Sequence, residues 1–176
     1  MSVGLGKTLG TQETKGILDV LHNTEFKPHK RGKYTEARWW GNEEVKKGFG
    51  EYLHWYLTTM TYPYNAPIKG CWSHLYKSRS GMMGMHQDKY ADIESSDCNY
   101  WITTCLVEKS VDLIGGEIVL AGDSYEDYEV FQSRLKVINL TETGQTAVWN
   151  GETVHGISEI TNGHRWVFVV YKEVER

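Results

Sequence analysis

Thr143–Trp166 reads TGQTAVWNGETVHGISEITNGHRW, and this stretch decides the fold of the chain. Short runs rich in β-branched and aromatic residues alternate here with the pairs Thr143-Gly144, Asn150-Gly151 and Asn162-Gly163. Because glycine and asparagine tolerate positive φ, such pairs mark turns between strands. The stretch therefore predicts a succession of short strands joined by tight connections.

The same pattern extends outward from this stretch over the rest of the chain from Cys71 onward. About eight short runs recur between Gly, Asn, Asp and Ser breaks, which is typical of an all-β sandwich or barrel. Eight antiparallel strands in two facing sheets form a jelly roll, whose open mouth suits a buried metal. The runs lie near 72–77, 82–88, 100–108, 117–121, 130–139, 146–149, 154–160 and 165–172.

The first third of the chain has helical patterns instead. Thr11–His22 places apolar residues on one side behind a polar start, which predicts a short amphipathic helix. Asn42 suits the N-cap of a second helix from Glu43 to about Thr59, with Val45, Phe49, Leu53 and Tyr56 as its apolar stripe. We expect one domain over 1–176, with a helical part over about 1–65 and a jelly-roll core over about 70–174.

Charge and cysteine content limit the classes of function. The 176 residues carry a net charge of −4, which gives no general attraction to nucleic acid or to an anionic membrane. The three cysteines are odd in number and lack CxxC spacing, which predicts a reducing, cytoplasmic setting. No apolar run approaches the roughly 20 residues that span a bilayer. A basic run at Lys27–Arg38 is either a solvated loop or a binding patch.

The candidate site consists of His86-Gln87-Asp88, His155 far downstream, and Arg165 beyond it. In a strand, residues two apart point to the same face, so His86 and Asp88 can reach one metal while Gln87 points away. Two imidazoles and one carboxylate form the facial triad that holds Fe(II) with open positions. We expect His155 and Arg165 on adjacent antiparallel strands. As a single residue, Arg165 also suits an ordinary ion pair with Glu159 or Glu152.

The ordered set of motifs resembles the Fe(II)- and 2-oxoglutarate-dependent oxygenases of the prolyl 4-hydroxylase-like branch. The resemblance covers roughly Met82–Tyr171 and rests on HQD at 86–88, on Gly115-Gly116-Glu117 opening a strand, and on the stretch 143–166. It implies a double-stranded β-helix, a cupin-like jelly roll. It also implies that His86, Asp88 and His155 are the iron ligands, and that Arg165 binds the far carboxylate of 2-oxoglutarate.

What the resemblance implies about activity is hydroxylation of an aliphatic C–H, with O2 and 2-oxoglutarate as co-substrates and ascorbate as a supporting reductant. Its branch favours a prolyl or other residue in a peptide, with a free amino acid or small metabolite as the alternative. Nucleic-acid dealkylation is disfavoured, because such enzymes usually carry a second arginine where this chain has Tyr171. A non-catalytic jelly-roll binding protein is the alternative from another class.

Further residues are candidates for roles around the metal. Tyr76, Tyr100 and Thr104 offer hydroxyl groups of the kind that resembling enzymes use to bind 2-oxoglutarate. The polar, acidic segment Lys89–Asn99 is either a substrate lid or a solvated loop. His164 alternates away from Arg165, so we expect it outside the site. The sequence leaves the oligomeric state open.

Overall fold

The computed structural model describes residues 4–28, 35–68, 70–76, 82–88, 98–122 and 135–175, and of these only the main chain at 28, 35–40, 42, 70–76, 98–99 and 173–175. Two helices and eleven strands lie in this described part of the chain. In chain order they are β1 (Gly4–Leu5), α1 (Thr11–His22), β2 (Lys27–Pro28), β3 (Thr35–Gly41), α2 (Asn42–Met60), β4 (Gly70–Tyr76), β5 (Met83–His86), β6 (Cys98–Lys109), β7 (Ile118–Leu120), β8 (Lys136–Ile138), β9 (Thr146–Asn150), β10 (His155–Ile157) and β11 (Arg165–Glu175).

The strands form two antiparallel sheets. The small sheet has the order β5-β10-β7-β8, and the large sheet has the order β1-β9-β6-β11-β4-β3-β2. The central part of the large sheet, β9-β6-β11-β4, and the small sheet together make two sets of four strands. Each of the eight predicted runs overlaps one of these strands, which confirms the jelly roll. The N-terminal strands β1, β2 and β3 extend the large sheet and were not predicted.

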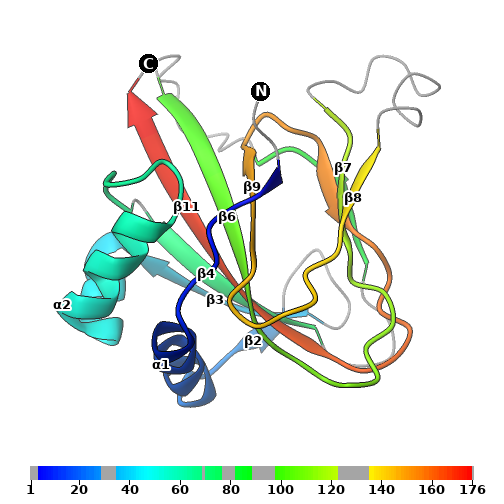
Figure 1. Cartoon of the computed structure of the whole chain (residues 1–176), viewed down its shortest axis with the longest axis horizontal. Helices are drawn as coiled ribbons and strands as arrows, with labels where there is room; N and C mark the ends of the chain where they lie inside the picture. Colours follow the sequence, from blue (N-terminus) through cyan, green and yellow to red (C-terminus); the bar gives the residue numbers. More distant parts are fainter. Residues whose placement is uncertain are drawn as a thin grey trace.

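Two apolar clusters explain the order of the layers. Along β11, Phe168 and Val170 pack with α1 and α2, whereas Val167, Val169 and Tyr171 pack between the sheets. This alternation follows from the period of two in a strand, and it gives the large sheet two buried faces. Figure 1 shows the helices on one side of the large sheet and β7 and β8 on the other.

The helices agree with the sequence patterns except at one end. The helix predicted at Thr11–His22 has those bounds, and the predicted stripe of α2 is buried at Val45, Phe49 and Leu53. The N-cap of α2 is Gly41 and not Asn42. The carboxylate of Glu44 accepts a hydrogen bond from the Gly41 N–H at 3.0 Å, so a side chain within the first turn satisfies this end.

The prediction that His155 and Arg165 lie on adjacent strands is wrong. His155 begins β10 in the small sheet, and Arg165 begins β11 in the large sheet. The connection through Asn162-Gly163 therefore passes from one sheet to the other. An isolated β-bridge between Ile114 and Asn162 holds this connection in place. The two side chains come from facing sheets and not from neighbouring strands.

Neither α1 nor α2 has the length and apolar character of a membrane-crossing helix.

Cys105 is buried, and burial raises the pKa of its thiol, so it is not a reactive thiolate. The side chains of Cys71 and Cys98 lie outside the described part of the chain.

Candidate metal centre

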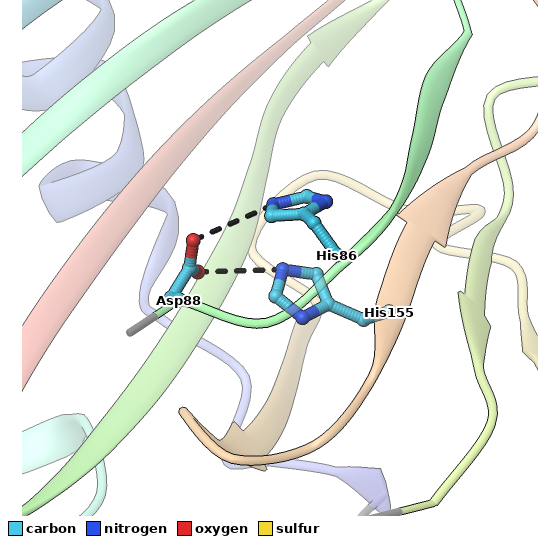
Figure 2. Close-up of side chains that lie close together, drawn as sticks. All are labelled: His86, Asp88 and His155. Atoms are coloured by element: carbon cyan, nitrogen blue, oxygen red, sulfur yellow. Dashed lines mark ion pairs between the residues drawn. The ribbon is translucent and has the colours of Figure 1, made fainter. Parts of the chain in front are cut away.

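Three potential metal ligands converge at one end of the small sheet. His86 ends β5, His155 begins β10, and the two are direct partners across these antiparallel strands. Asp88 lies two residues beyond β5, and its carboxylate points toward both rings (Figure 2). Its Oδ1 is 3.4 Å from His86 Nε2, and its Oδ2 is 3.3 Å from His155 Nε2. One potential ligand atom of each residue lies within 4.8 Å of the others.

Main-chain carbonyls fix the orientation of both imidazoles. His86 Nδ1 lies 2.8 Å from the carbonyl oxygen of Gly84, and His155 Nδ1 lies 2.9 Å from that of Thr153. A carbonyl oxygen only accepts, so each Nδ1 must carry the proton and donate it. In the neutral ring, Nε2 then presents a lone pair. Second-sphere hydrogen bonds of this kind are typical of metal-binding histidines.

The charge of the site favours a bound cation. Burial alone would raise the pKa of Asp88, but the hydrogen-bonding groups of His155 and His86 lower it further than burial raises it. Asp88 is therefore a carboxylate at neutral pH. If both rings are neutral, two nitrogen lone pairs and this anion face one another within a few ångströms, which is electrostatically unfavourable unless a cation lies between them. Either protonation of the rings, which lowers the pKa of Asp88, or a bound metal supplies this positive charge. The donor set fits a divalent metal.

Tyr171 and Gln87 belong to the site although neither was predicted there. The Tyr171 hydroxyl donates to Asp88 Oδ2 at 3.0 Å. The Gln87 side-chain amide donates to the carbonyl oxygen of Glu152 at 2.5 Å. It thus ties the segment that carries His86 and Asp88 to the turn that leads into His155.

The turn at 150–153 is further ordered by close contacts. Glu152 N–H donates to the Asn150 side chain at 2.9 Å, and Thr153 N–H donates to the Asn150 carbonyl at 2.8 Å. A Cβ at Gly151 would lie 3.3 Å from the carbonyl oxygen of Asp88. A glycine therefore allows the two ligand-bearing segments to approach closely.

Arg165 lies at the start of β11 and is 2 % exposed. Its Cα pairs with Lys109 of β6 and with Tyr76 of β4. A Cβ at Gly116 would lie 3.1 Å from Ile160 Cγ1 and 3.2 Å from Arg165 Nε, so this glycine makes room for both side chains. A buried guanidinium group is permanently charged and planar, and it is suited to binding a carboxylate through two hydrogen bonds.

The remaining predicted residues have different positions. Thr104 is buried and pairs with Ala147 and Val169, which places it on the face of β6 between the sheets. Tyr100 has a buried hydroxyl, and its carbonyl accepts a hydrogen bond from Gly151 N–H. The side chain of Tyr76 and residues 89–97 of the suggested lid lie outside the described part of the chain. His164 Nε2 lies 3.4 Å from Glu108 Oε1, away from the triad.

Two imidazole nitrogens and one carboxylate oxygen can hold a six-coordinate metal by one face and leave the other positions open. A 2-oxo acid that chelated such a metal would need a cation for its distal carboxylate. Arg165 is the described buried arginine that could serve as this cation.

Comparison with protein-family models and with curated protein sequences finds no match for this chain. Comparison with solved structures finds matches that cover most of this chain at low sequence identity.

A 2OG-Fe(II) oxygenase family oxidoreductase from Burkholderia pseudomallei has a TM-score of 0.63 and 15 % identity, over 92 % of this chain and 79 % of that chain. A prolyl-4-hydroxylase from Pseudomonas putida has a TM-score of 0.59 and 10 % identity, over 97 % and 93 %. HygX from Streptomyces hygroscopicus, with nickel, 2-oxoglutarate and hygromycin B bound, has a TM-score of 0.61 and 11 % identity, over 97 % and 83 %. The chain therefore has the jelly-roll fold of the 2-oxoglutarate- and Fe(II)-dependent oxygenases.

Proposed function

We propose that this protein is an Fe(II)- and 2-oxoglutarate-dependent oxygenase that hydroxylates an aliphatic C–H bond. The observation that carries the proposal is the convergence of His86 Nε2, His155 Nε2 and the Asp88 carboxylate, with both imidazoles oriented by main-chain carbonyls. A chance cluster of polar residues would not need both rings held in the same tautomer. This donor set suits Fe(II).

Arg165 supplies the second part of the proposal. With neutral imidazoles, one carboxylate and one guanidinium, the protein groups contribute no net charge to the site. A divalent metal and the dianion 2-oxoglutarate would then balance each other, which lowers the cost of burying both. Tyr100 and Thr104 are the described candidates for hydroxyl groups that hold the co-substrate.

The metal with 2-oxoglutarate and O2 supplies the oxidising chemistry, and the chain's own residues hold and orient these components. His86, Asp88 and His155 would bind the metal by one face. Arg165 would bind the distal carboxylate and set the direction of the co-substrate. The buried sides of this site limit access of water from within the jelly roll.

A prolyl or other residue in a peptide is the substrate class that we propose first. The likeness to a prolyl-4-hydroxylase supports this choice, and the predicted branch agrees with it. HygX, which has hygromycin B bound in its structure, supports a small molecule or free amino acid as the second candidate.

An anaerobic titration with Fe(II) and 2-oxoglutarate tests the cofactors, because the chelate gives a weak visible charge-transfer band. We expect Asp88→Ala to abolish the band and Arg165→Ala to weaken 2-oxoglutarate binding at least about tenfold, as for the loss of a charge-assisted pair. His164→Ala is the matched control, because this histidine lies outside the triad and should leave the band unchanged. A folded wild-type protein without the band would instead favour a non-catalytic jelly-roll binding protein.

Succinate formation tests the substrate class. Proline-containing peptides, free amino acids and small metabolites would be compared for substrate-dependent conversion of 2-oxoglutarate to succinate, with product mass confirming an added oxygen. Stimulation by peptides alone would support the first choice. Stimulation only by small molecules would replace it with the second.

A further inference from the structure

The phenol of Tyr171 is hydrogen-bonded to a proposed metal ligand from a distant part of the chain. Its hydroxyl donates to Asp88 Oδ2 at 3.0 Å, across 83 residues of sequence. Tyr171 is 5 % exposed and packs in the cluster between the sheets. Burial of the ring restricts the directions in which the hydroxyl can point.

A carboxylate can bind a metal through one oxygen or through both. Binding through both would use a fourth position on a six-coordinate metal and leave too few for a chelating 2-oxo acid together with O2. A donor on one oxygen removes electron density from it and occupies its lone pair, so the other oxygen becomes the better ligand. In this site the donor is Tyr171, and the oxygen that it leaves available is Asp88 Oδ1.

We infer that Tyr171 is a positioning residue that keeps Asp88 a one-oxygen ligand and thereby preserves an open coordination position. This inference rests on the proposed metal site and concerns how that site is tuned. Tyr171 acts through Asp88 and is not itself a ligand.

Contacts on the opposite face of β11 help to keep the Tyr171 phenol in place. The Nζ atom of Lys172, the next residue, lies 2.6, 2.9 and 3.1 Å from the carbonyl oxygens of Thr58, Thr61 and Pro63 and forms hydrogen bonds to them. Because successive residues of a strand point to opposite faces, this anchor on the helix side fixes the backbone from which Tyr171 extends toward Asp88. Strand β11 is also paired on both sides, with β4 and β6, so a shift of its register would break hydrogen bonds to both neighbours.

Titration with Co(II) alone, followed by its visible bands, provides the test without any requirement for activity. Tyr171→Phe removes the hydroxyl and keeps the ring, and we expect it to weaken Co(II) binding about tenfold, as for other second-sphere ligand partners. Tyr56→Phe is the matched control: it removes a hydroxyl that accepts the Gly10 N–H at 2.9 Å and should not change Co(II) affinity.

A structural role for Tyr171 is separated by repeating the substitution in an Asp88→Ala background. If the phenol acts through Asp88, Tyr171→Phe should cause no further loss of Co(II) affinity there. An equal loss in both backgrounds, or no loss in either, would overturn the inference.

Difference infrared spectra of the metal-bound and metal-free protein give a second readout. We expect a smaller separation of the asymmetric and symmetric carboxylate stretches in Tyr171→Phe than in the wild type, as both oxygens of Asp88 then bind. An unchanged separation would contradict the inference. If the wild-type protein does not bind Co(II) at all, the proposed metal site fails, which is a different result from equal binding by wild type and Tyr171→Phe.

Discussion

The side-chain amide of Gln87 donates to the main-chain carbonyl of Glu152, 65 residues away in sequence, at 2.5 Å. The residue between two of the proposed ligands is thereby tied to the turn that leads into the third. This contact joins the two halves of the candidate metal centre without contributing a ligand.

Replacing Gln87 with alanine should therefore weaken metal binding more than it weakens the fold. We expect a several-fold lower affinity for Co(II), because the ligand-bearing segments lose a second-sphere restraint. The free energy of unfolding should fall by only about 1 kcal/mol, the usual net value of a hydrogen bond. Gln145→Ala is the control, since that amide accepts the Thr141 N–H at 2.7 Å away from the site. Equal Co(II) affinity in both variants would contradict this role for Gln87.

The pairing of β5 with β10 depends on a glycine next to His155. A Cβ at Gly156 would lie 2.7 Å from the carbonyl oxygen of Met83 and 2.8 Å from Met85 Sδ. Gly156→Ala should separate these strands, lower the free energy of unfolding by about 1–3 kcal/mol and weaken metal binding. Gly84→Ala is the matched control in the same sheet, because nothing lies within 4 Å of its added Cβ. Thermal unfolding and Co(II) titration of both variants provide the measurements.

Alanine substitutions at two glycines with similar φ distinguish the effect of backbone strain from the effect of crowding beside Arg165. Gly116 has φ of 78° and Gly122 has φ of 87°, so alanine at either position costs about 1–2 kcal/mol of backbone strain. Only at Gly116 would the new methyl group lie 3.2 Å from Arg165 Nε, whereas at Gly122 it would meet nothing within 4 Å. We expect Gly116→Ala to weaken 2-oxoglutarate binding about tenfold or more and Gly122→Ala to leave it unchanged. Similar binding by both variants would argue against Arg165 as the carboxylate-binding residue.

Stability should depend on pH through Lys172. Burial lowers the pKa of its ammonium group from 10.5 to about 7. Between these values the unfolded chain holds one more proton than the folded chain, so folding becomes more favourable as pH rises through this range. The gain is at most about 1.4 kcal/mol per pH unit.

Urea unfolding of wild type and Lys172→Met from pH 7 to 10 isolates this contribution. The wild type should gain stability relative to the variant as pH rises, because the variant lacks the titrating group. Lys15→Met, which removes an exposed i,i+4 pair with Asp19, is the control and should follow the wild type. A constant difference between wild type and Lys172→Met would disprove the coupling.

Local patterns in the sequence were enough to single out three residues that the structure brings together, but not the way in which these residues are supported. His86 and Asp88 were recognisable by their spacing, and His155 by its place after a turn. The contact of Tyr171 with Asp88 was not predictable, although alternation along β11 puts Tyr171 on the same face as Arg165, because the partner is fixed only by the facing sheet. Lys172 is a charged residue in a buried strand position, and sequence patterns assign such residues to solvent. The separation of His155 and Arg165 into two sheets was missed because a turn motif does not reveal whether its strands pair.

The pairing of His86 with His155 across β5 and β10 also bears on the order of assembly. These partners are far apart in sequence, and closing the long intervening loop is entropically costly. The proposed metal can therefore not act as a local template, because its ligands come from two segments that are far apart in sequence. Metal binding should instead stabilise the pairing of β5 with β10 after it has formed. The amide hydrogens of these strands should then exchange with solvent more slowly once the metal is bound.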